Sequence, residues 1–215
     1  DLSPEEMQLY TEVTEYVREQ MNRADRLSEE GQGRRGNTVG FALTLLQRRL
    51  ASSPEAIYQS LNRRRKRLES RVIEERQASR AASLGMTESE NRLSALLSDS
   101  VDEFNVDSFD DLDAEEQEEL ELEVVDAATA AATVAELEAE IFLLKTIERL
   151  ALELRGKHVD TKWVQLSKLL QDNEEMFDKD GNRRKLIIFT EHRDTLNYLV
   201  DRLRTFMGSG DDDSD

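Results

Sequence analysis

The chain has 215 residues, 38% of them hydrophobic, and a formal net charge of −18, which allows a modest core and excludes a large compact one. It holds no cysteine and two histidines, so a disulfide framework and a Cys/His zinc site are both excluded. No run of about eighteen apolar residues occurs, and residues 1–10 lack the basic and apolar parts of a signal peptide. We therefore expect a cytoplasmic protein without a membrane partner.

The charges are unevenly distributed along the chain. Residues 34–80 contain 12 basic and 4 acidic residues, whereas residues 86–140 contain 19 acidic residues and one arginine. Arginine also outnumbers lysine by 22 to 7. A strongly acidic surface with few lysines stays hydrated in concentrated salt, so the composition favours a halophilic, haloarchaeal source.

The first predicted element is a helix from Ser3 to about residue 22, because Ser3, Pro4 and Glu6 supply an N-cap, a first-turn proline and a capping box. Residues 27–40 hold four of the nine glycines, which predicts a flexible loop. Residues 38–51 are apolar nearly all round and predict a buried helix. Ser53 and Pro54 then begin an arginine-rich helix over 54–83, which has an apolar face. That face consists of Ile57, Leu61, Leu68 and Val72.

The middle of the chain is acidic. A second capping-box pattern at residues 87–90 predicts a short helix to about residue 97, and residues 98–113 are aperiodic and predict a loop or disorder. A long helix is expected from residue 114 to about 155. Its apolar stripe, which covers fewer than three heptads, consists of Leu137, Ile141, Leu144, Ile147, Leu150 and Leu154. So short a stripe favours an antiparallel partner within the chain, the arginine-rich helix, over a coiled coil.

The last predicted elements are a capped helix and a strand–helix unit. Asp160 is expected to cap the next helix. The apolar residues that repeat with helical spacing there are Val159, just before the cap, and Trp163, Leu166 and Leu170. Four consecutive apolar residues, 186–189, predict a buried strand that leads into a helix. The expected inner face of that helix is Leu196, Leu199, Val200 and Leu203. Because a lone strand leaves its amides unpaired, residues 186–189 should be covered by helices or pair through self-association.

The predicted fold is mainly α, with long antiparallel helices forming an elongated helical bundle and one β-strand–helix unit near the C-terminus. We divide it into a helical region over 1–97 that includes the basic helix 54–83, an acidic loop over 98–113, a long helix plus the Trp163 helix over 114–175, the strand–helix unit over 176–207, and a disordered tail over 208–215.

The sequence offers little independent chemistry. Gly156-Lys157 is followed by His158 in place of the hydroxyl residue of a phosphate-binding loop, and no Gly-x-Ser-x-Gly turn occurs. The acidic residues could bind cations loosely, but a solvated loop is the favoured reading. For His158 and His192, surface or capping roles are favoured over ligation or proton transfer.

The basic helix is the more informative feature. Its charged run consists of Arg63, Arg64, Arg65, Lys66 and Arg67. Spread over more than one helical face, these residues could follow a phosphate backbone with salt-dependent, sequence-independent affinity. Alternatively, they pair with the acidic segment or face solvent.

Four stretches, residues 2–19, 40–69, 160–170 and 183–204, resemble in this order the region that joins the two RecA-like lobes of Swi/Snf-type superfamily-two helicases. The resemblance implies that the first stretch closes lobe one, that the middle forms helical protrusions, and that residues 185–199 open lobe two as its fourth helicase motif. The chain would then be a fragment of a parent that uses ATP and Mg²⁺. Residues 86–135 have no counterpart that we can match.

By the same resemblance, residues just after the predicted strand contact the nucleic-acid backbone. These are Thr190, Glu191, His192 and Arg193. A hydroxyl and free amides at a helix N-terminus suit a phosphate, although Thr190 could equally be a simple N-cap. The Walker A loop, the Asp-Glu-x-His box and the arginine finger are absent from these 215 residues, so no cofactor and no ATP hydrolysis are expected of them. Two classes stay open: an inter-lobe insertion of an ATP-driven translocase, and a helical protein-interaction module that does not bind nucleic acid.

Overall fold

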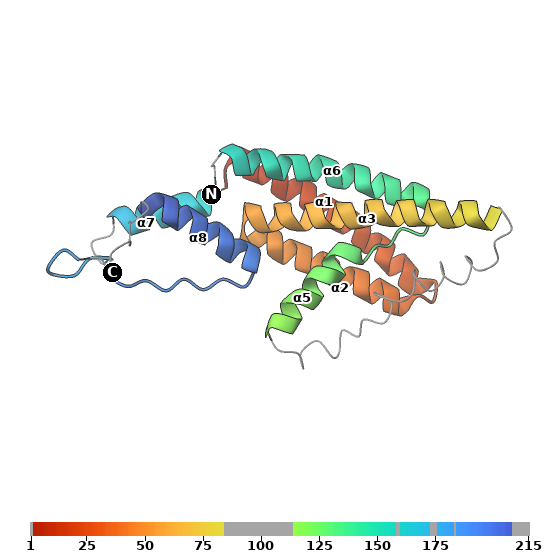
Figure 1. The fold of residues 1–215 in the computed structure, drawn as a ribbon, viewed down its shortest axis with the longest axis horizontal. Helices are drawn as coiled ribbons and strands as arrows, with labels where there is room; N and C mark the ends of the chain where they lie inside the picture. The colour runs from red at the N-terminus through yellow and green to blue at the C-terminus, as the bar shows by residue number, and fades with distance from the viewer. Residues whose placement is uncertain (1, 84–113, 158–159, 173–175, 183, 208–215) are drawn as a thin grey trace.

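The computed structural model describes residues 2–83, 114–157, 160–172, 176–182 and 184–207, and within these ranges the protein is all-α (Figure 1). The helices are α1 (Pro4–Glu29), α2 (Gly33–Ser52), α3 (Pro54–Ser83), α5 (Ala114–Ala127), α6 (Val134–Lys157), α7 (Thr161–Asp172) and α8 (Arg193–Met207). The predicted mainly α, elongated bundle is confirmed. No helix among the described residues is long and apolar enough to cross a membrane.

The body of the protein consists of four long helices. Successive helices α1, α2 and α3 run antiparallel, and α6 runs antiparallel to α3 and also contacts α1, which closes the bundle (Figure 1). The shorter α5 crosses α2 and α3, while α7 and α8 lie at one end of the body (Figure 1). The arginine-rich helix is therefore the antiparallel partner of α6, as the apolar stripe predicted.

The core lies between the apolar faces of these four helices. All four members of the predicted α3 face are buried, and so is the α6 stripe apart from the half-buried Leu150. The α1 and α2 helices contribute Leu9, Val13, Val17, Leu43, Leu46 and Leu50. Each such side chain stabilises the fold by roughly 1.5–3 kcal/mol relative to an exposed one.

Three helix starts are capped as predicted. Ser3 Oγ accepts the Glu6 amide at 3.2 Å while the Glu6 carboxylate accepts the Ser3 amide at 2.7 Å, a complete capping box. Ser53 Oγ accepts the amide of the third residue of α3 at 3.0 Å. Asp160 Oδ1 accepts the amides of Lys162 and Trp163 at 2.9 and 3.1 Å. These caps fix where α1, α3 and α7 begin.

The flexible loop predicted over 27–40 is wrong. The α1 helix continues to Glu29 and α2 begins at Gly33, so the turn is only three residues long, with Gly31 at a φ of 88°. Gly36 serves helix packing instead of flexibility: a Cβ there would lie 2.1 Å from Ser28 Oγ and 2.7 Å from the Ala24 carbonyl oxygen. Its missing side chain lets α1 and α2 approach closely.

The single long helix predicted from residue 114 to about 155 is also wrong. The chain leaves the helical path between Ala127 and Val134. Thr133 Oγ1 accepts the Glu136 amide at 3.2 Å, and the Glu136 carboxylate accepts the Thr133 amide at 3.1 Å, so a second capping box begins α6. The break lets α5 cross the bundle in another direction from α6 (Figure 1).

The predicted strand over 186–189 is not formed, since the described part of the chain contains no β-strand. Residues 184–190 have no regular secondary structure and run as an extended trace before α8 (Figure 1), with Ile187 75% and Phe189 90% exposed. The physical reason is that an isolated extended segment has no ladder of hydrogen bonds to join. The expected inner face of α8 is wrong for Leu196, which is exposed, because the helix turns Thr195 toward the bundle instead.

Four further predictions lie outside the described residues. They are the short helix ending near residue 97, the acidic loop over 98–113, the surface or capping role of His158, and the tail over 208–215.

Candidate nucleic-acid interface

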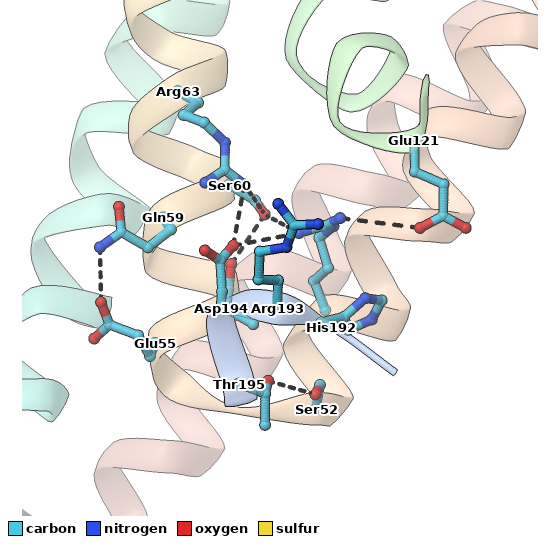
Figure 2. A network of polar contacts seen from close by, with 12 residues as sticks. Ser52, Glu55, Gln59, Ser60, Arg63, Glu121, His192, Arg193, Asp194 and Thr195 are labelled. Carbon is cyan, nitrogen blue, oxygen red and sulfur yellow. Dashed lines mark hydrogen bonds and ion pairs between the residues drawn. The ribbon is translucent and has the colours of Figure 1, made fainter. Parts of the chain in front are cut away.

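The predicted nucleic-acid residues fall in two groups that the fold brings close together. Residues 63–67 lie on α3, and Thr190, His192 and Arg193 lie at or just before the start of α8. Asp194 joins the two groups, because its Oδ2 lies 3.2 Å from Arg63 Nη2 (Figure 2). The start of α8 therefore packs directly on the basic helix.

The five basic residues on α3 have different surroundings. Arg64 is only 1% exposed and its guanidinium pairs with Glu140 at 2.8 Å, so it belongs to the core. Arg65 lies 2.5 Å from Glu148 and 2.8 Å from Glu69. Lys66 and Arg67 are exposed. Arg64 and Arg65 thus pair with acidic residues, and Lys66 and Arg67 face solvent, which are the two alternatives to nucleic-acid binding that the sequence left open.

Arg63 pairs with acids from two other helices. Its Nε lies 3.4 Å from Asp126 Oδ2 on α5, in addition to its contact with Asp194 on α8. The acidic segment therefore neutralises the basic helix at this point through Asp126.

Arg49 is a site residue that the sequence reasoning missed. It is 1% exposed, and its guanidinium lies 3.4 Å from Asp194 Oδ2 and 3.9 Å from Glu121 Oε2. A buried arginine is costly without acidic partners, so an arginine within the apolar pattern over 38–51 was the available signal. The partners themselves, Glu121 and Asp194, gave no signal in the sequence.

The start of α8 is held to the α2–α3 corner by hydroxyl groups. Thr195 Oγ1 lies 2.7 Å from Ser52 Oγ and 2.9 Å from Ser53 Oγ (Figure 2). On the other side, Glu118 of α5 accepts the Arg193 amide at 2.8 Å. These contacts position the first turn of α8 between α2, α3 and α5.

His192 is buried, at 1% exposure, so the surface role expected for it is wrong. Its carbonyl oxygen accepts the Leu196 amide at 3.0 Å, which places it at the N-cap position of α8 and agrees with the capping role. Burial lowers the pKa of its imidazole to about 4, and the nearby charges of Arg49 and Arg48 act in the same direction. His192 is therefore neutral at neutral pH.

Burial acts in the opposite sense on the acids of α5. It raises the pKa of Asp126 to about 6, although Arg63 and Arg64 oppose this rise. It also raises the pKa of Glu121, against the opposing charges of Arg48 and Arg49. These carboxylates are thus held less favourably than their ion pairs alone would indicate.

A hollow of about 580 Å³ lies between this corner and helices α7 and α8. Thr190 and Trp163 are among the residues that line it. Several of its polar groups already have partners: Lys162 Nζ donates to the Ala51 carbonyl oxygen, and Tyr198 donates to Asp160 at 2.7 Å. Among the described residues, no group of three or more His, Asp or Glu side chains is arranged to hold a metal ion.

No family model, no curated protein and no solved structure matches this chain.

Proposed function

We propose that this chain is the helical region between the two RecA-like lobes of a Swi/Snf-type ATP-dependent helicase or translocase, and that it contributes contacts to nucleic-acid phosphates and coupling between the lobes. ATP and Mg²⁺ would act in the lobes of the parent, since this sequence lacks the Walker A, Asp-Glu-x-His and arginine-finger motifs.

The observation that carries the proposal is the extended segment before α8. Ile187 and Phe189 project apolar side chains into solvent from a segment without a strand partner in the described part of the chain. An apolar run that leads directly into an amphipathic helix is typical of a strand–helix unit in an α/β domain, where helices cover both faces of the sheet. We expect residues 186–189 to become the first strand of lobe two when the rest of that sheet is present.

The proposed nucleic-acid surface combines Lys66 and Arg67 on α3 with Thr190 and Arg193 at the start of α8. Lys66 and Arg67 are exposed and can reach phosphates without unfolding the bundle. The buried Arg64 and His192 would support the surface from beneath, because neither reaches solvent. Binding of this kind should be independent of base sequence and should weaken steeply with salt.

Fluorescence anisotropy with labelled 20-base-pair DNA and RNA duplexes tests the proposal. The affinity of the wild type should fall as KCl rises, with a slope of about 0.9 in log K per phosphate contacted. The double variant K66E/R67E should bind at least about tenfold more weakly, since each charge contact is reversed. The matched control is R18E/R26E, which makes the same charge change at exposed residues of α1.

No duplex binding at low salt, or equal binding by K66E/R67E and the control, would overturn the nucleic-acid role. Circular dichroism of each variant should show unchanged helicity, because all four side chains are exposed.

A second candidate function is a helical protein-interaction module without nucleic-acid binding. One observation favours it: Arg63, Arg64 and Arg65 are all neutralised by carboxylates of the chain itself. The duplex titration separates the two candidates, because this alternative requires that no binding occurs even at the lowest salt.

A further inference from the structure

A carboxylate from α5 occupies the N-terminus of α8. Glu118 Oε1 accepts the backbone amide of Arg193 at 2.8 Å, and Glu118 Oε2 lies 3.5 Å from Arg193 Nε. Glu118 and Arg193 are 75 residues apart in the sequence, so this is a tertiary contact and not a local cap. An anion therefore already lies where the start of α8 would receive a phosphate oxygen.

The same helix supplies most of the negative charge in this region. Glu121 lies 3.8 Å from Arg48 and 3.9 Å from Arg49. With Asp126 on Arg63 and Glu118 on Arg193, α5 provides three of the five carboxylates that pair with these four arginines within the described part of the chain; Glu191 and Asp194 provide the other two. Without Glu118 and Glu121, the four guanidinium groups would face three of these carboxylates, and the region would attract anions.

Two buried side chains at this site have polar atoms that α5 does not satisfy. Within the described part of the chain, Arg49 Nε and Nη2 and both ring nitrogens of His192 lack a hydrogen-bond partner. Each side chain is 1% exposed, so water does not replace the missing partner readily. A buried donor without an acceptor destabilises the fold, so the site is better suited to a ligand with more oxygen atoms than α5 offers.

We propose that Arg48, Arg49, His192 and the α8 N-terminus form a binding site for a phosphate group, and that residues 114–121 of α5 are an internal plug which blocks it. The tetrahedral oxygens of a phosphate could accept hydrogen bonds from the Arg193 amide and from the guanidinium groups together. That the phosphate belongs to a nucleic-acid backbone rests on the function proposed above.

The anchoring of α5 identifies which half would move. Arg64 Nη1 donates to the Val125 carbonyl oxygen at 2.6 Å, and Arg35 donates to the Thr129 and Ala131 carbonyl oxygens at 3.1 and 2.8 Å. These bonds, with the buried Val124, fix the end of α5 to the bundle. Residues 114–121 are held in part by the ion pairs of Glu118 and Glu121, which high salt or a competing phosphate would weaken, and in part by Leu120, which packs against the core.

The decisive experiment removes the charge of the plug without changing its shape. The variant E118Q/E121Q keeps side chains of the same size, and E119Q/E123Q is the matched control, with the same charge change at exposed positions of the same helix. Pyrophosphate is titrated into each protein, and the amide signal of Arg193 is followed by NMR. A labelled duplex is then titrated into the same variants.

We expect pyrophosphate to shift the Arg193 amide in E118Q/E121Q at a concentration at least about tenfold lower than in the wild type or the control, because two competing charges are absent. Duplex binding should tighten by a similar factor. An unchanged Arg193 amide in E118Q/E121Q would overturn the site.

The two proposals fail separately. If pyrophosphate binds to E118Q/E121Q but no variant binds duplex, the phosphate site stands and the nucleic-acid function fails. If every variant binds duplex equally and with the salt dependence given above, the function stands and the plug is refuted. If E118Q/E121Q loses helicity, the variant E118A alone provides the same pyrophosphate test.

Discussion

Replacing Arg64 by methionine should unfold the protein much more readily than replacing its exposed neighbour Arg67. Arg64 lies in the core, where its guanidinium donates to three acceptors: the Tyr16 hydroxyl at 2.8 Å, the Val125 carbonyl at 2.6 Å and Glu140 at 2.8 Å. Methionine fills most of the same volume but provides no donor. The change therefore tests the ion pair rather than the packing.

The size of the effect follows from what remains after the substitution. Glu140 is 1% exposed and, within the part of the chain that the structure describes, would keep only the hydroxyl groups of Tyr16 and Thr129, at 2.7 and 2.6 Å, to stabilise its charge. Removing one partner of a buried ion pair costs about 3–5 kcal/mol. The double variant R64M/E140Q should recover about 1–3 kcal/mol of this loss, because the unpaired charge is then absent as well.

Urea unfolding followed by far-ultraviolet circular dichroism measures these free energies. The control R67M should change the free energy of unfolding by about 0.5 kcal/mol or less, as is usual for exposed side chains. A cost below about 1 kcal/mol for R64M, or no recovery in the double variant, would refute a buried ion pair. In that case Arg64 would be available for nucleic acid, as its position within the basic run first indicated.

Three smaller predictions address the rest of the fold. The pKa of Asp126 rises on folding from 3.8 to about 6, so its contribution to stability is lost as pH rises through this interval. In urea unfolding, the free energy of unfolding of D126N should therefore increase relative to that of the wild type by up to ~3 kcal/mol between pH 4 and pH 7. A difference that does not change with pH would contradict this. Replacing Thr133 by alanine should cost about 1 kcal/mol in the same assay through loss of the α6 cap, and an unchanged urea midpoint would argue against the capping box. Gly36→Ala should lower the free energy of unfolding by about 1–3 kcal/mol, because the added methyl group would meet α1. The control Gly33→Ala has open space around the added methyl group and should not lower it. Equal effects of the two substitutions would mean that the close approach of the helices is unimportant.

Local sequence patterns predicted much of the fold. The caps at Ser3, Ser53 and Asp160 and the apolar faces of α3 and α6 were readable because capping and helical periodicity depend on residues within one or two turns. The capping box at Thr133 carried the same signal, and the alanine-rich composition around it obscured the helix break. The glycines in the first turns of α2 were misread, because the sequence does not distinguish a glycine that permits close helix packing from one that permits a turn.

The candidate site was less predictable than the fold. Its two basic groups, on α3 and at the start of α8, were identified from the sequence, but their neighbours were not. Glu118, Glu121 and Asp126 belong to an acidic segment with many similar residues, and only the crossing of α5 over α2 and α3 selects these three. The burial of Arg64 and Arg49 follows equally from packing between helices that are distant in the sequence.

A bundle of long, highly charged helices follows from the sequence, because hydrophobic period, caps and charge are local properties of the chain. Which arginines are neutralised, which face solvent, and the exposure of the segment over 186–189 depend on how the helices pack. The physical reason is that ion pairing and strand pairing both require a partner brought from elsewhere in space, and a linear pattern does not specify that partner.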